Sequence, residues 1–298
     1  MAVRIGNAAA PRWFDCSLDR LDAYIAFLQA CGATSTELVL HHGPADDWIA
    51  RVHVLEADWF PVIQRFQDAG IDCHVHAPLH PRFGFDRWTN DPFLFASEWR
   101  PLLRVLVQLA ERQREPTTLV VHAASSNSDE GTRATVEALH WLLAELGGLS
   151  ENVRIGIELR RPASTDDARI DRSRESLVAF VARQRDRRVG ICWDIANDWQ
   201  SAAIRAVPLT VPDASFLRLV NHVHLHDAGA SDDAVHHPLN LERVPWRPMV
   251  GALIGQGFAD AVTMEIRYRH ALDQGDPWLV LADSYQRLRS SLTVLDDE

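Results

Sequence analysis

The sequence lacks paired cysteines and long apolar runs. Its four cysteines are scattered and form no CxxC pair: Cys16, Cys31, Cys73 and Cys192. This pattern argues against a disulfide framework and favours a reducing compartment. No uncharged run approaches the roughly 18 residues needed to span a bilayer, and residues 1–13 lack the apolar stretch of about 7–15 residues typical of a secretory signal. We therefore expect a cytoplasmic protein that does not enter a membrane.

Basic residues are also in short supply. Lysine and arginine number 30 against 41 acidic residues, which gives a formal net charge of −11. Because proteins that bind phosphate backbones usually carry a basic face, this charge disfavours nucleic acid as a partner and favours a small molecule. No linker or low-complexity run interrupts the 298 residues, of which 47% are hydrophobic. We expect one domain over residues 1–298.

Eight short apolar runs recur along the chain, separated by segments of helical period. They lie at residues 3–6, 36–40, 71–76, 117–122, 153–159, 189–194, 221–226 and 260–266. The last helical segment begins with Asp276 as a cap and Pro277 at the first helical position. Two stretches around 78–95 and 195–215, which contain proline and tryptophan, are expected to be irregular.

Eight strands alternating with helices predict a single-domain (β/α)8 barrel of the α/β class. The alternative is a doubly wound open sheet. However, the first apolar run continues as RIGNAAAP and carries no glycine-rich phosphate loop. A barrel places its active site at the carboxyl ends of its strands, so the polar residues found there are candidates for chemistry.

Six consecutive apolar runs end in histidine, aspartate or glutamate. These residues are His74, His76, His122, Glu158, Asp194, His224, His226, Asp227 and Glu265. Carboxylates and imidazoles that converge on one barrel mouth would repel one another or stay unpaired unless a cation gathered them. The pattern therefore predicts a divalent metal.

The seventh run, VNHVHLHD, places a histidine at every second position. Alternate residues of a strand project to the same side, here towards the barrel interior at successive heights. We expect His222 to be a buried, hydrogen-bonded core residue. His224 is the candidate metal ligand, and His226 is expected to contact a metal-binding side chain or the substrate.

An ordered series of motifs, HAPLHP, VVHAAS, IGIELR, ICWDIAND, HVHLHDAG and TMEIRY, resembles the successive strand ends of the xylose isomerase-like barrel superfamily. That superfamily includes sugar and sugar-phosphate isomerases and epimerases as well as endonuclease IV. The resemblance covers roughly residues 17–290. It implies one metal held by Glu158, Asp194, His224 and Glu265.

Three carboxylates and one imidazole form an oxygen-rich ligand set that suits Mn²⁺, Mg²⁺ or Co²⁺, with Zn²⁺ as a further option. The resemblance implies that Glu158 and Glu265 act as an acid/base pair. The expected reaction is isomerisation or epimerisation of a sugar, a sugar phosphate or a keto acid, with an enediolate stabilised by the metal.

Two arginines follow the glutamates at the same spacing, Arg160 in ELR and Arg267 in EIR. They could bind an anionic substrate group or pair with neighbouring acids. In many relatives the sixth strand reads Asp-x-x-His, but here Asn197 takes the place of that histidine. Asparagine can bind a hydroxyl group, yet it is a poor metal ligand and no general base, so the sixth strand departs from the standard epimerase pattern.

Three alternatives remain open. Endonuclease IV cleaves DNA at abasic sites with three zinc ions, and its further ligands would fall on His76, His122 and His236, with Asp233 nearby. An amidohydrolase is suggested by HVH at 74–76, but those barrels carry this motif on the first strand. The third alternative is a barrel that binds a sugar without turnover. Barrels of this class often associate, so a homo-oligomer also stays open.

Overall fold

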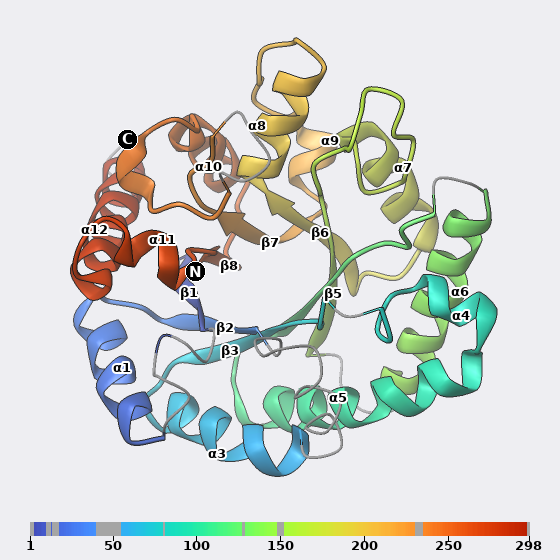
Figure 1. Ribbon diagram of the computed structural model, residues 1–298, viewed down its shortest axis with the longest axis horizontal. Helices are drawn as coiled ribbons and strands as arrows, with labels where there is room; N and C mark the ends of the chain where they lie inside the picture. The colour runs from blue at the N-terminus through green and yellow to red at the C-terminus, as the bar shows by residue number, and fades with distance from the viewer. Residues whose placement is uncertain are drawn as a thin grey trace.

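The computed structural model describes residues 3–9, 13, 18–39, 55–79, 81–126, 129–147, 152–229 and 235–296. Eight parallel strands follow one another in chain order and close into a barrel, with helices packed around it (Figure 1). The strands are β1 (Arg4–Ala9), β2 (Ser35–Val39), β3 (Asp72–His76), β4 (Thr117–Val121), β5 (Val153–Glu158), β6 (Val189–Asp194), β7 (Val220–Leu225) and β8 (Ala261–Met264). The predicted (β/α)8 barrel is confirmed. The extent of the domain, residues 1–298, stays a prediction because it includes residues outside the described ranges.

Several helices begin at a side-chain cap. Asp276 accepts a hydrogen bond from the N–H of Trp278 at 2.9 Å, as predicted, and Asp91 accepts one from Leu94 at 2.9 Å. The described helices are α1 (Leu18–Ala30), α3 (Leu55–Asp68), α4 (Asp86–Asn90), α5 (Pro92–Arg112), α6 (Asp129–Leu146), α7 (Arg174–Gln184), α8 (Ile195–Ile204), α9 (Ala214–Leu217), η3 (Leu239–Leu241), α10 (Trp246–Gly255), α11 (Tyr268–Leu272) and α12 (Pro277–Asp296).

The prediction of irregular structure around 78–95 and 195–215 is wrong in part. Residues 86–90 form α4, residues from 92 belong to α5, and residues 195–204 form α8. Helix α8 starts directly after β6 because the side chain of Asp194 caps it, with Oδ1 accepting the N–H of Asn197 at 2.8 Å. The same carboxylate thus ends a strand and begins a helix, which leaves no loop between the two elements.

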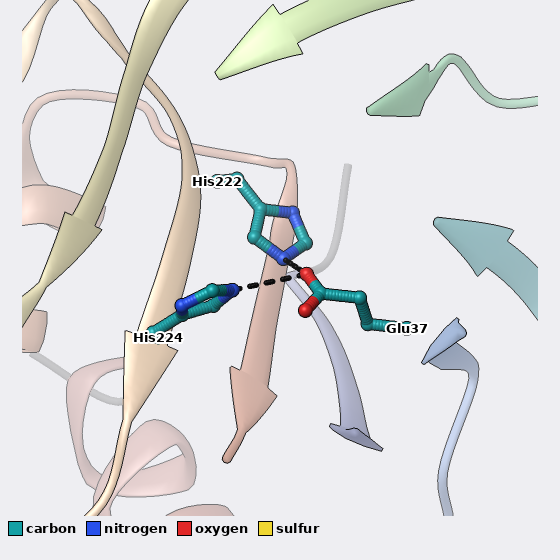
Figure 2. Close-up of side chains that lie close together, drawn as sticks. All are labelled: Glu37, His222 and His224. Carbon is teal, nitrogen blue, oxygen red and sulfur yellow. Dashed lines mark hydrogen bonds and ion pairs between the residues drawn. The ribbon is translucent and has the colours of Figure 1, made fainter. Parts of the chain in front are cut away.

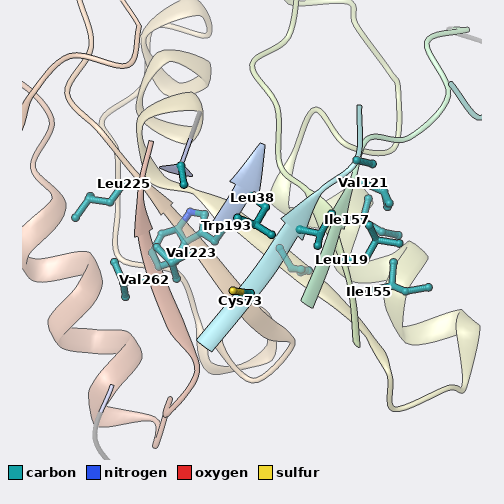
Figure 3. Packing of buried hydrophobic residues seen from close by; sticks show 14 of the residues in the cluster. Leu38, Cys73, Leu119, Val121, Ile155, Ile157, Trp193, Val223, Leu225 and Val262 are labelled. Carbon is teal, nitrogen blue, oxygen red and sulfur yellow. The ribbon is translucent and has the colours of Figure 1, made fainter. Parts of the chain in front are cut away.

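The two faces of the strands carry different side chains. Apolar residues such as Leu38, Ile157 and Val223 belong to a buried cluster that also includes residues of the surrounding helices (Figure 3). The alternating partners of these residues, among them Glu37 and His222, are polar and meet inside the barrel. Because side chains alternate along a strand, the apolar outer face fixes the polar groups on the inner face. The fold thereby positions the candidate site.

Within the described ranges, none of the helices is both long enough and apolar enough to span a bilayer. Cys31, Cys73 and Cys192 are free thiols, and Cys73 and Cys192 are buried. The fourth cysteine, Cys16, lies outside the described residues.

Candidate metal centre

The carboxyl ends of β5 to β8 bring four polar side chains together at one mouth of the barrel. Ligand atoms of Glu158, Asp194 and His224 all lie within 4.8 Å of one another. Glu265, which follows β8, places Oε2 3.4 Å from Nδ1 of His224, and Oε2 of Glu158 is 3.9 Å from the same nitrogen. Asp194 and His224 are fully buried. The structure therefore brings together the four residues that the sequence proposes as ligands, although their role as ligands stays a prediction.

His224 presents an unsatisfied nitrogen to these carboxylates. Its Nε2 donates to Glu37 at 3.0 Å, while its buried Nδ1 has no hydrogen-bond partner among the described residues. Burial alone would lower the pKa of His224, but Cys192, Glu37 and Glu265 together hold it well above its usual value. Nδ1 thus lies where a positive charge, a proton or a cation, is favoured. This donor set fits a divalent metal.

Glu158 accepts hydrogen bonds from three side chains. Its Oε2 lies 2.8 Å from Nε2 of His122 and 3.1 Å from Nε2 of His76. The amide nitrogen of Asn197 is 3.4 Å from its Oε1 and 2.7 Å from Oδ2 of Asp194. Burial would raise the pKa of Glu158, but His122 and His76 hold it well below its usual range. The carboxylate is therefore ionised, and Asn197 joins it to Asp194.

Arg160 orients His122. Its Nη1 lies 3.0 Å from Nδ1 of His122, and its Nε donates to Oδ2 of Asp171 at 2.7 Å. Because a guanidinium can only donate, Nδ1 of His122 accepts and Nε2 carries the proton given to Glu158. Burial and the charge of Arg160 lower the pKa of His122, partly opposed by Glu158. Arg160 therefore pairs with an acid, whereas Arg267 is exposed.

A second group of side chains lies beside Glu265. Nδ1 of His236 is 3.4 Å from Oε2 of Glu265, and the rings of His236 and His226 are 4.4 Å apart. Nε2 of His226 lies 3.3 Å from Oδ2 of Asp194. Burial would raise the pKa of Glu265, but His236 and His224 hold it at about 2. His236 has a left-handed backbone, with φ +59°, which costs energy in a non-glycine residue. Asp233 lies outside the described residues.

Glu37 is the residue that the sequence reasoning missed. It is fully buried on β2 and contacts two histidines of β7 (Figure 2). The available signal was a single charge inside the apolar run TELVL, at a position whose neighbours face outwards. His222 is buried and hydrogen-bonded, 3.1 Å from Oγ1 of Thr263, which confirms its prediction as a core residue.

A cavity of about 760 Å³ lies at the opposite end of the barrel, where β5, β6 and β7 begin. Its walls are rich in arginine. Among them, Arg188 pairs with Asp186 at 2.8 Å and Arg154 pairs with Asp260 at 2.6 Å. None of the clustered histidines and carboxylates of the mouth lines this cavity. The chemistry-bearing side chains of the barrel are therefore separate from it.

The chain belongs to the xylose isomerase-like TIM barrel family, whose sequence profile matches residues 25–291. It is similar in structure to D-psicose 3-epimerase from Clostridium cellulolyticum H10, solved with D-tagatose, with a TM-score of 0.70, 12% identity and coverage of 97% of this chain and 99% of that one. D-allulose 3-epimerase from Methylomonas sp., solved in complex with D-allulose, gives a TM-score of 0.66 at 14% identity and covers 97% of each chain. A xylose isomerase domain protein from Alicyclobacillus acidocaldarius gives 0.68 at 17% identity, with 99% and 100% covered. No curated protein sequence matches the chain.

Proposed function

We propose that the protein is a divalent-metal-dependent isomerase or epimerase of a sugar, a sugar phosphate or a related keto acid. The observation that carries this proposal is the convergence of three carboxylates on the unsatisfied Nδ1 of His224. The similarity to D-psicose and D-allulose 3-epimerases supports the choice of substrate class.

Glu158, Asp194, His224 and Glu265 would hold the metal. An oxygen-rich set of this kind suits Mn²⁺, Mg²⁺ or Co²⁺, and Zn²⁺ is also compatible with it. When bound, the ion would supply a positive charge that stabilises the enediolate formed as a proton leaves carbon.

Glu158 and Glu265 are proposed as the acid/base pair. They come from β5 and β8, and neighbouring histidines keep both carboxylates ionised at neutral pH. A base must be reachable by the substrate, and the side chain of Glu265 is 19% exposed against 6% for Glu158. Glu265 is thus the more open proton acceptor. Glu158 is itself ionised, so a proton that it returns from the other side would come from the protonated ring of His76, whose Nε2 lies 3.1 Å from its Oε2.

The substrate is proposed to be a polyhydroxyl compound because the mouth offers a neutral acceptor. The amide nitrogen of Asn197 donates to Asp194 and Glu158, which leaves the side-chain oxygen of this partly exposed residue to accept from a hydroxyl group. Arg160 is paired with Asp171 through Nε and bonded to His122 through Nη1, which leaves only its buried Nη2 without a partner among the described residues, so it does not offer a full guanidinium fork to a phosphate.

The test is metal-dependent proton exchange. The protein is stripped with EDTA, reloaded with Mn²⁺, Mg²⁺, Co²⁺ or Zn²⁺ singly, and incubated in D₂O with D-fructose, D-tagatose or D-psicose. We expect deuterium at the carbon next to the carbonyl, only with metal, and loss of this exchange in Glu158→Gln and Glu265→Gln. Glu98→Gln is the matched control, since Glu98 is a buried glutamate on α5 paired with Arg82. Exchange that survives in both site variants would contradict the proposal.

One observation favours a second candidate, an abasic-site endonuclease. His76, His122 and Glu158 form one further group able to hold a metal, and His226, His236 and Glu265 form another. Three metals per chain together with nicking of abasic DNA would support this function. One metal together with exchange on sugars would support the first. Sugar binding by calorimetry without any exchange would indicate a barrel that binds but does not turn over.

A further inference from the structure

Glu37 is a buried carboxylate on which two histidines converge (Figure 2). Its Oε2 lies 2.7 Å from Nε2 of His222 and 3.0 Å from Nε2 of His224. Nε2 of His222 is also 3.1 Å from Oγ1 of Thr263. Taking a carboxylate fully out of water costs on the order of several kcal/mol. An apolar side chain would fill the same space without that cost. A function of the carboxylate group must therefore explain why glutamate occupies this position.

This function follows from the two nitrogens of His224. An imidazole that donates from Nε2 has its lone pair on Nδ1 when the ring is neutral. That nitrogen lies 3.4 Å from Oε2 of Glu265 and 3.9 Å from Oε2 of Glu158. The stacked ring of His76, with centroids 5.7 Å apart at 21°, limits rotation of the imidazole. Glu37 thus selects which nitrogen of His224 faces the mouth.

We propose that Glu37 is a positioning residue of the metal centre. It holds His224 as the Nε2–H tautomer and turns Nδ1 towards a divalent cation, alongside Glu158, Asp194 and Glu265. A carboxylate bonded to the far nitrogen of a ligand histidine fixes the ring and raises its basicity. The inference rests on the proposed function for its metal, but its test needs no substrate.

The competing arrangement makes Glu37, His222 and His224 ligands of a separate cation, since their ligand atoms lie within 4.8 Å of one another. Ligands about 2.0–2.2 Å from a tetrahedral ion lie about 3.4 Å apart. The separations of 2.7 Å and 3.0 Å are shorter and match hydrogen bonds. The geometry therefore favours positioning over ligation.

The experiment is calorimetric titration of the EDTA-stripped full chain with Mn²⁺ and with Co²⁺. We expect one ion per wild-type chain. Glu37→Gln keeps an acceptor but loses the charge, and it should weaken the affinity about 10–100-fold. Glu37→Ala should weaken it further, and Glu98→Gln should leave it unchanged. Thermal melting of the same metal-free samples reports their folding separately, so a lower melting temperature alone does not mimic the expected result.

A second readout follows the tautomer directly. In the zinc-loaded protein, ¹⁵N NMR of the imidazoles should show Nε2 of His224 protonated and Nδ1 bound to the ion. Equal affinities in wild type, Glu37→Gln and Glu37→Ala would overturn the positioning role and leave the metal centre intact. Two ions in wild type that fall to one in Glu37→Ala would overturn it in favour of ligation. A wild-type chain that binds no ion would overturn the metal centre and this inference together.

Discussion

Asp227 anchors the segment that brings His236 to the mouth, and its removal gives a quantitative test of the structure. This fully buried residue follows β7. Its Oδ1 accepts the N–H groups of Ala228 at 2.8 Å and Val244 at 3.1 Å, and its Oδ2 accepts that of Arg243 at 3.0 Å. Both ends of the segment between Asp227 and Val244 therefore depend on one carboxylate.

The cost of replacing Asp227 can be worked out from these three bonds. In Asp227→Asn one oxygen remains, so two N–H groups keep an acceptor and the third meets an amide N–H. One lost bond to a charged group is worth about 1.5–3 kcal/mol. In Asp227→Ala all three donors lose their partner. Two of these donors, the N–H groups of Ala228 and Val244, are buried, whereas that of Arg243 is partly buried. At about 1–3 kcal/mol for each of the two buried donors, and with incomplete additivity, we expect the free energy of unfolding to fall by about 3–5 kcal/mol.

Urea unfolding of the metal-free protein, followed by tryptophan fluorescence, measures both losses. The control is Asp213→Asn, because Asp213 accepts the N–H groups of Ser215 and Phe216 at an exposed helix start, where water can replace it. We expect Asp227→Ala to lose the most unfolding free energy, Asp227→Asn to lose less, and the control Asp213→Asn to lose the least. A loss below about 0.5 kcal/mol for Asp227→Ala, the range of ordinary surface changes, would refute the reasoning.

Two further predictions concern a titration and a pair of glycines. In the metal-free protein each ring nitrogen of His76 has an acceptor, a backbone carbonyl at 2.7 Å and Glu158 at 3.1 Å. Burial opposes the charged ring, but Glu158 and other carboxylates raise the pKa of His76 to about 9. Its contribution to stability is therefore full below pH 6.5 and lost as the pH rises through about 9. NMR titration of the ring protons checks this, and a midpoint below 6.5 would contradict it. Gly190→Ala would place Cβ 2.5 Å from Nδ2 of Asn221 and should destabilise by about 1–3 kcal/mol. At Gly255, the last residue of α10, an added Cβ would meet no atom within 4 Å, so Gly255→Ala should stabilise the protein by about 0.4–1 kcal/mol. Equal unfolding free energies for the Gly190→Ala and Gly255→Ala variants would count against the packing argument.

The fold could be predicted because apolar runs and helical segments alternate in a regular order. Strand β6 matches its predicted range of 189–194, and most other strand ends differ from prediction by one or two residues. The missed helix α8 shows where this reasoning stops. Asp194 was interpreted only as a strand-end ligand, whereas its side chain also caps the helix that follows. Because a single aspartate serves both roles, the sequence contains no separate residue that would indicate the start of the helix.

The candidate site was foreseeable as far as it lies at strand ends. The carboxyl ends of parallel strands meet at one mouth, so order along the chain was enough to group Glu158, Asp194, His224 and Glu265. Glu37 could not be found in this way, because its contact with β7 depends on which side chains face each other across the closed barrel. Strand order gives neighbours along the wall but not the pairs that meet inside it.

The choice between one metal and three turns on Asn197. Its amide nitrogen donates to both Asp194 and Glu158, and an N–H₂ group repels a cation where a histidine would offer a lone pair. The imidazoles of His76 and His122 already donate to Glu158, so binding a second ion there would require these bonds to break. By contrast, Nδ1 of His224 has no hydrogen bond to give up among the described residues. The first ion therefore has only a proton on Nδ1 to displace, whereas a further ion must compete with hydrogen bonds that are already made, which is why we expect a single metal at the mouth of this barrel.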